Sequence, residues 1–191
     1  MILVRAVLIL AGALLAGCVS APPGLLPGRE EMRDFALEAR FALRTTLPEQ
    51  APQSSGGRLS WAHKNGDDRV LVANPLGIGL AEIEIKPRLA RLRTADGQQY
   101  ESTDADALLA EVTGQALPVS RLAAWLLGKA GPASVMEIDG SGRPSRFREA
   151  GWQIEYGYAD DAAGALPDRL TLRREQEIEL RLRIEEWREA R

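Results

Sequence analysis

The chain has 191 residues, with 24 basic and 27 acidic side chains, and 45% of its residues are hydrophobic. That length fits one domain with a sizeable core, and a formal charge of −3 argues against a nucleic-acid-binding protein. A single cysteine excludes a disulfide framework and a multi-cysteine metal site, and a single histidine leaves little for histidine-based catalysis. We therefore expect no metal site and no cofactor.

The first seventeen residues are predicted to be a targeting segment. They are apolar apart from Arg5, and their apolar core at 6–16 is too short to span a bilayer. The segment ends in Leu15-Ala16-Gly17-Cys18, which resembles the lipobox of bacterial lipoproteins, where small residues precede a cysteine that is lipidated and becomes the mature N-terminus. An ordinary secretory signal followed by an incidental cysteine is the alternative.

Cys18 is therefore predicted to be the lipid-attachment site. Val19, rather than Asp, follows it, and in such lipoproteins this favours the outer membrane over retention in the inner membrane. The predicted organisation is a signal peptide at 1–17, a lipidated N-terminus and tether at 18–34, and one folded domain at 35–191. A short helical segment at 29–34 is expected just before the first strand.

From residue 35 onward, apolar and polar side chains alternate with period two, as in strands that bury one face. At 178–185, Ile and Leu alternate with Glu and Arg, whereas a helix would scatter those charges all round its axis. Short turns join most of these runs, so the strands are predicted to be antiparallel, with His63 on the solvent side. The predicted strands are 35–43, 57–63, 68–73, 79–86, 89–94, 98–102, 133–139, 144–150, 152–158, 168–174 and 178–185.

Two helices are predicted to interrupt the strands. Thr103 and Asp106 form a capping-box pattern before a helix that ends at Gly114. Ser120 is expected to cap a second helix, which stops at Gly128. The predicted fold is thus mainly β, an unclosed antiparallel barrel of about eleven strands with a short helical cover over a hydrophobic cavity. A sandwich filled by its own side chains is the alternative that the pattern leaves open.

The turn Asn74-Pro75-Leu76-Gly77 carries an apolar residue where the tips of turns are normally polar. Pro75 fixes one backbone angle and Gly77 permits a positive φ, so the local pattern is that of a turn. Residues 76–80 contain no charge. Leu76 either folds back onto the core or forms an exposed apolar finger that enters a membrane or an apolar partner.

In their order and spacing these segments resemble the LolB family of outer-membrane lipoproteins, which receive other lipoproteins and insert them into that membrane. The resemblance runs from the lipobox through the strand that ends in Val72-Ala73-Asn74-Pro75-Leu76-Gly77 and the Pro118…Leu122…Trp125 helix to the terminal Leu180…Ile184…Trp187. It implies an unclosed barrel with a cavity for acyl chains and a protruding Leu76 that membrane insertion requires. The polar segment before the first strand is short here, which argues against a long N-terminal helix in the cover.

The resemblance also implies partners and a site. An acceptor anchored through Cys18 at the periplasmic face of the outer membrane would meet a soluble LolA-like carrier, acylated lipoproteins as cargo, and outer-membrane lipids. We expect a monomer that binds no nucleic acid. Membrane insertion is assigned to the loop of Leu76, Pro75 and Gly77. The candidate walls of the acyl-chain cavity are Phe41, Trp61, Ile83, Leu122, Trp125, Leu126, Trp152 and Leu180. For the three tryptophans, core packing is the alternative.

Two other classes of protein compete with this interpretation. A structural or assembly-accessory outer-membrane lipoprotein would bind a protein partner and no lipid, and its core would be filled. A lipid-modifying hydrolase would need an activated nucleophile, but the chain has no Gly-x-Ser-x-Gly sequence and its one histidine has no evident catalytic partner. We therefore expect no enzymatic activity.

Overall fold

The computed structural model describes residues 26–190 except residues 47, 48, 50 and 133. Within these residues the chain forms eleven strands and two helices, and neither helix is long and apolar enough to cross a membrane. The elements are β1 (Phe35–Thr45), β2 (Gln53–Lys64), β3 (Asp67–Ala73), β4 (Gly79–Lys86), β5 (Leu89–Thr94), β6 (Gln99–Ser102), α2 (Ala105–Thr113), α3 (Val119–Leu126), β7 (Val135–Ile138), β8 (Pro144–Glu149), β9 (Trp152–Gly157), β10 (Arg169–Arg174) and β11 (Ile178–Arg188).

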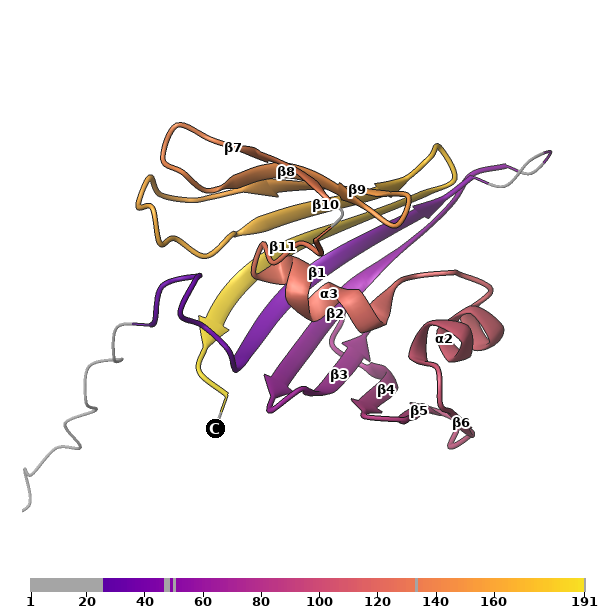
Figure 1. Cartoon of the computed structure of the whole chain (residues 1–191). Helices are drawn as coiled ribbons and strands as arrows, with labels where there is room; N and C mark the ends of the chain where they lie inside the picture. Colours follow the sequence, from indigo (N-terminus) through magenta and orange to yellow (C-terminus); the bar gives the residue numbers. More distant parts are fainter. Residues whose placement is uncertain (1–25, 47–48, 50, 133, 191) are drawn as a thin grey trace, which may run out of the picture.

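All the strands belong to one curved antiparallel sheet, in the order β6-β5-β4-β3-β2-β1-β11-β10-β9-β8-β7. β1 pairs with both β2 and β11, so it joins two runs of consecutive strands into one sheet. Among the described residues, β6 and β7 do not pair with each other, and the segment between them carries α2 and α3 across the concave face (Figure 1). The sheet is an unclosed barrel, which confirms the predicted fold class.

Alternation along each strand produces the two faces of this sheet. In β11, Ile178, Leu180, Leu182 and Ile184 are buried on the concave side, and the residues between them point outward. All eleven predicted strands are present, with shifted ends. β2 begins at Gln53 rather than at residue 57, because this polar stretch continues the pairing with β1 although its side chains are exposed.

One predicted helix is absent from the described part of the chain, and the predicted N-caps of the other two are wrong. Residues 29–34 contain a turn instead of a short helix, and Met32 N–H donates to the carbonyl of Gly28 (3.0 Å). The N-cap of α2 is Asp104 and not Thr103, since the Asp104 carboxylate accepts the N–H groups of Asp106 and Ala107. Gly114 ends α2 as predicted, with a left-handed φ of 69°.

Ser120 does not cap α3, because Pro118 occupies the N-cap position. Instead, the N–H and hydroxyl groups of Ser120 donate to the carboxylate of Asp106 on α2, at 2.9 and 2.8 Å. The Asp106 side chain was expected to cap its own helix, α2, but it accepts hydrogen bonds from the first turn of α3 instead. These two bonds tie the first turn of α3 to the first turn of α2.

The concave face has two parts with different packing. Over β8, β9 and β10, α3 inserts Trp125 against Phe147 and Trp152, with ring centroids 6.0 and 6.5 Å apart. We call this part the filled half. Over β1 to β4 and the start of β11, α2 and α3 approach the sheet without filling the space below them. We call that part the hollow half.

Candidate functional site

An apolar cavity of about 420 Å³ occupies the hollow half. This volume is within the range of about 300–1,000 Å³ typical of small-molecule sites. Five strands form its walls, and α2, α3 and their connection form its cover. Its lining residues are Phe41, Leu43, Thr45, Gln53, Ser54, Ser55, Leu59, Trp61, Val70, Val72, Ile83, Ile85, Leu109, Thr113, Gln115, Leu117, Val119, Leu122, Leu180 and Leu182.

Four of the six polar members of this lining lie together at one end of the cavity. Gln53 pairs with Thr45 where β1 ends and β2 begins, and Ser54 and Ser55 follow on β2. Residues 53–55 are exposed, so the cavity meets solvent at this end, which we call the mouth. An apolar interior with a polar mouth suits an amphiphilic ligand whose tail enters first.

One carboxylate fixes α3, and with it part of the cavity cover, to the filled half. Glu149 on β8 pairs with Arg121 and accepts hydrogen bonds from the Trp125 indole (3.1 Å) and from Gly131 N–H (2.7 Å). Burial alone would raise the pKa of Glu149, but these three donors hold it below its ordinary value. The Tyr156 hydroxyl also donates to the Trp125 carbonyl. Leu122 is therefore held over the cavity by an anchored helix.

Five of the eight candidate wall residues line the cavity, namely Phe41, Trp61, Ile83, Leu122 and Leu180. The other three candidates are buried but do not line it. Trp125 and Trp152 pack together in the filled half, and Leu126 is a full turn beyond Leu122 toward that half. Val70, Val72 and Ile85 also line the cavity and were not among the predicted wall residues, although the alternation in β3 and β4 places them on the inward face.

His63 lies on the concave side of β2, so its predicted solvent-side position is wrong. It follows Trp61 by two residues and therefore shares its face, and its ring stacks on Phe35 with centroids 5.3 Å apart. His63 Nδ1 is 2.7 Å from Asp68 Oδ1, which also accepts the Trp61 indole N–H. The hydrogen bond to Asp68 raises the pKa of His63. The buried Asp68 is the partner that makes this inward position possible.

The loop between β3 and β4 exposes Leu76 to solvent over 87% of its surface. Leu76 thus does not fold back onto the core. Pro75 is also exposed, and Gly77 has a φ of 86°, which requires the left-handed region. Asn74 Oδ1 accepts the N–H groups of both Leu76 and Ile78, at 2.9 and 3.0 Å, so the loop has a defined conformation.

The loop and the cavity mouth lie at the same end of the sheet. Ala73, the last residue of β3, pairs with Arg58 on β2, and antiparallel pairing places the following loop beside the first residues of β2. Those first residues are Gln53 to Ser55 of the mouth. Cys18, the predicted lipid-attachment site, lies outside the described residues.

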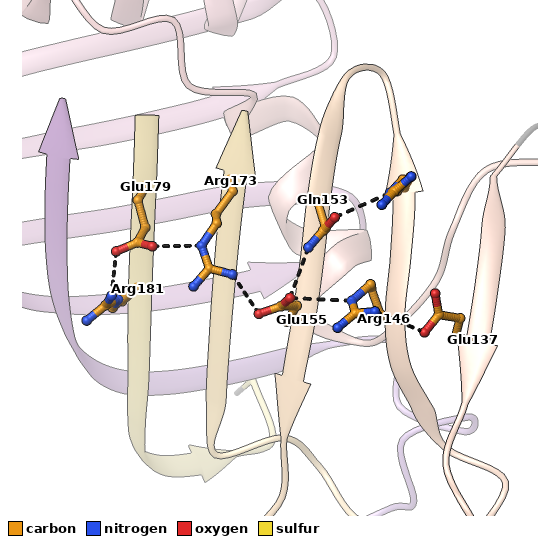
Figure 2. Close-up of polar contacts among 8 residues, drawn as sticks. Glu137, Arg146, Gln153, Glu155, Arg173, Glu179 and Arg181 are labelled. Atoms are coloured by element: carbon orange, nitrogen blue, oxygen red, sulfur yellow. Dashed lines mark hydrogen bonds and ion pairs between the residues drawn. The ribbon is translucent and has the colours of Figure 1, made fainter. Parts of the chain in front are cut away.

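The outer face of the sheet is covered by rows of charged side chains. Figure 2 shows one such row, in which Arg173 bonds to Glu179 and Glu155, both at 2.7 Å, and Arg146 bridges Glu155 and Glu137 at 3.4 and 3.2 Å. These pairs cross β11, β10, β9, β8 and β7. Each exposed pair contributes little to stability, so the row is best described as a solvated sheet face.

The fold and the site together define a class: an unclosed β-barrel with an apolar cavity under a helical cover and an exposed apolar loop beside the cavity mouth. A family model described as "Outer membrane lipoprotein LolB" matches residues 33–187. The chain belongs to the LolB family.

Individual relatives match over nearly the whole length. The outer-membrane lipoprotein LolB of Dechloromonas aromatica (strain RCB) is 60% identical over 183 residues, covering 96% of each chain. That of Azoarcus sp. (strain BH72) is 36% identical over 181 residues, covering 93% of this chain and 91% of that one. Among solved structures, a LolA superfamily protein, NE2245 from Nitrosomonas europaea, has a TM-score of 0.46 at 12% identity, covering 82% of this chain and 86% of that one.

Proposed function

We propose that this protein accepts lipoproteins from a soluble periplasmic carrier, holds their acyl chains in the cavity, and inserts them into the outer membrane. The observation that carries the proposal is an apolar cavity whose mouth lies at the same end of the sheet as the exposed Leu76. Membership of the LolB family supports it. A lipoprotein that only binds a protein partner is not favoured, because it would not need a hollow half.

The acceptor is anchored by lipid on Cys18 at the periplasmic face of the outer membrane and acts as a monomer. The relatives' names support this location, since they describe outer-membrane lipoproteins. The segment between Cys18 and β1 serves as the tether. A tether keeps the domain near its target membrane but leaves the Leu76 loop free to turn toward the bilayer.

The cargo explains why an apolar cavity is needed. Burying acyl chains is worth about 0.8 kcal/mol per CH₂ group, so a lipoprotein with three chains cannot cross the aqueous periplasm unprotected. Transfer between two proteins with similar apolar cavities is nearly isoenergetic, and a slightly better cavity draws the cargo forward. The bilayer then accepts the chains. This sequence of steps requires no nucleotide and no bond to be broken.

Each part of the site has a role in this proposal. Phe41, Ile83 and Leu180 face the acyl chains from the sheet, and Leu122 faces them from the cover. The polar mouth receives the carbonyl and amide groups that join the chains to the cargo's N-terminal cysteine. Leu76 enters the membrane and opens a path from the mouth into the hydrocarbon.

A Leu76→Glu variant tests the proposal. A purified carrier–lipoprotein complex is mixed with the chain lacking its own lipid, and two quantities are measured: cargo that co-purifies with the acceptor, and cargo that later floats with liposomes. We expect normal acceptance and failed deposition, because the cavity is untouched while a charge replaces the inserted side chain. Ile138→Glu is the matched control, since Ile138 is 67% exposed on β7. Deposition by Leu76→Glu at the wild-type rate would refute the role of the loop.

A further inference from the structure

The charged outer face of the sheet is interrupted at the end of β3 and the start of β4. Leu71 and Leu80 point outward there and are 44% and 45% exposed, and Ile78 is 63% exposed. Leu71 pairs with Glu82, which is two residues from Leu80, so the two leucines are diagonal neighbours on the outer face. Together with Leu76 they form one surface, which we call the apolar patch: Leu71, Leu76, Ile78 and Leu80.

The N–H groups of the loop backbone are already hydrogen-bonded before the loop meets any partner. Asn74 N–H donates to the Ile78 carbonyl, and Gly77 N–H donates to the Asn74 carbonyl, both at 2.9 Å. Asn74 Oδ1 accepts the N–H groups of Leu76 and Ile78, and Pro75 has none. Every N–H group from Asn74 to Ile78 therefore has a partner inside the loop. Contact with water or with a polar protein surface does not require this, whereas entry into hydrocarbon does.

Two arginines flank the apolar patch on the same outer face. Arg58 on β2 pairs with Ala73, and Arg93 on β5 pairs with Glu82. Arg58 is 3.3 Å from Glu185, whereas Arg93 has no ion-pair partner among the residues that the structure describes. Long side chains of this kind extend along apolar surface and place their charge at the level of lipid phosphates.

Two acidic groups oppose this attraction. Glu82, which is opposite Arg93 on the neighbouring strand, is already paired with Arg69. Asp96 lies on the turn between β5 and β6, next to the patch, because Ala95 N–H donates to the Leu80 carbonyl (2.8 Å). Its carboxylate already accepts hydrogen bonds from Thr94 and Gln98, and the Thr94 bond lowers the pKa of Asp96. We therefore expect anionic lipid to strengthen binding without being strictly required.

We propose that the whole apolar patch, and not Leu76 alone, lies on a phospholipid bilayer, with Arg58 and Arg93 at its headgroup phosphates. This inference rests on the proposed function and deepens it. A single finger would leave the domain free to rotate about Leu76. A patch that extends onto the outer face of β3 and β4 fixes the orientation of the domain and holds the cavity mouth against the membrane surface.

The full acylated chain, reconstituted in vesicles of phosphatidylethanolamine and phosphatidylglycerol, allows a direct test. Cys18 is the only cysteine, and because lipid occupies it in our proposal, a second cysteine provides a unique thiol for an environment-sensitive fluorophore. The label is placed in Leu76→Cys, Ile78→Cys and Leu80→Cys, with Ile138→Cys as control. Quenching by lipids that carry a nitroxide near the headgroup is then measured. These positions are exposed, so labelling does not disturb the core.

We expect quenching at positions 76, 78 and 80 to exceed that at 138 several-fold. If position 76 is quenched while positions 78 and 80 are quenched no more than position 138, membrane contact by the whole apolar patch is overturned. Insertion of Leu76 alone then remains. If position 76 is also quenched no more than position 138, Leu76 does not enter the membrane. That result would contradict the proposed function itself and not only the extension from Leu76 to the whole patch.

The contribution of Arg93 is tested in the same vesicles. Arg93→Gln should reduce the docked population reported by the label at 78 about fivefold, and replacing phosphatidylglycerol with phosphatidylcholine should remove the difference between this variant and the parent chain. Arg148→Gln, a change at an exposed arginine on β8, serves as the control and should have no effect. An Arg93→Gln variant that docks like the parent on anionic vesicles would overturn the placement of Arg93 at the phosphates.

Discussion

The filled half and the hollow half belong to one sheet and have the same alternation of side chains, yet only one of them is packed. In the filled half, Trp125 is fully buried against Phe147 and Trp152. In the hollow half, Trp61 points into the same concave space and lines a cavity. The difference arises from the position of α3, which inserts its aromatic side chain on one side only. Strand alternation decides which side chains face inward, and the helix decides whether they meet a partner.

The two halves also differ in how they hold the cover. On the filled side, Glu149 and Tyr156 bind α3 through hydrogen bonds and an ion pair. On the hollow side, Leu117, Val119 and Leu122 face the cavity space. The filled half therefore acts as a scaffold, while the hollow half keeps apolar surface available for a ligand.

The largest expected difference between the halves is in how much free energy of unfolding is lost when a tryptophan is replaced by alanine. Trp125→Ala should lower the free energy of unfolding by about 3–5 kcal/mol, because it empties a packed aromatic cluster. Trp61→Ala should lower the free energy of unfolding by at least about 1 kcal/mol less than Trp125→Ala does. The reason is that the Trp61 side chain borders the cavity and so has fewer packing contacts to lose. The comparison is matched, because each indole donates to a carboxylate, Glu149 or Asp68. Urea unfolding of both variants measures it, and equal losses would contradict the distinction between the halves.

The second comparison adds volume instead of removing it. Ile154→Phe in the filled half should destabilise the protein by about 1–3 kcal/mol through overpacking. Val70→Phe in the hollow half should change the unfolding free energy by less than about 1 kcal/mol, because the added ring enters the cavity. The same variant should weaken binding of a fluorescent fatty acid. Strong destabilisation by Val70→Phe would show that the hollow half is closed in solution.

The third comparison concerns the anchor of α3. Glu149→Gln removes the charge that bonds to Arg121 and should cost about 1–3 kcal/mol at pH 7. The pKa of Glu149 is lowered in the folded protein, so this stabilisation is present above its ordinary value of 4.5 and is lost as the pH falls through the lowered value. The unfolding free energies of parent and variant should thus approach each other as the pH falls below 4.5 and converge below the lowered pKa. A difference that persists unchanged to pH 3 would exclude Glu149 ionisation as its source.

Much of the fold could be predicted because burial imposes a local pattern. The runs at 79–86 and 89–94 match β4 and β5 in full, since the side chains of each strand alternate between the two faces of the sheet and each strand ends at a short turn. The two errors in side-chain placement have different causes. Asp106 bonds to Ser120 fourteen residues away, and local spacing does not reveal such a pair. The inward position of His63 does follow from its spacing to Trp61, but a polar ring on that face needs a buried partner, which Asp68 across the hairpin provides.

The cavity walls were predictable only in part for the same reason. Alternation correctly gave inward positions to Trp61, Ile83 and Leu180, and Leu76 was recognisable because an apolar tip is unusual in a turn. The pattern could not separate Trp125 and Trp152 from the walls, because all large inward side chains look alike in sequence. Trp125 and Trp152 lie away from the cavity because the long-range contact of Glu149 with α3 holds Trp125 in the filled half.

The pairing of β1 with β11 has a consequence for how the protein folds. These strands are the first and the last of the described chain, and Ala36 pairs with Arg188. The run from β1 to β6 consists of hairpins that can form early, but β1 keeps a bare edge until β11 has been synthesised and exported. Contacts of such high sequence separation form slowly, and an exposed strand edge invites aggregation. Until β11 pairs with β1, the hollow half lacks the wall formed by Leu180 and Leu182, so the open edge of β1 is the part of the newly made chain that a chaperone would have most reason to cover.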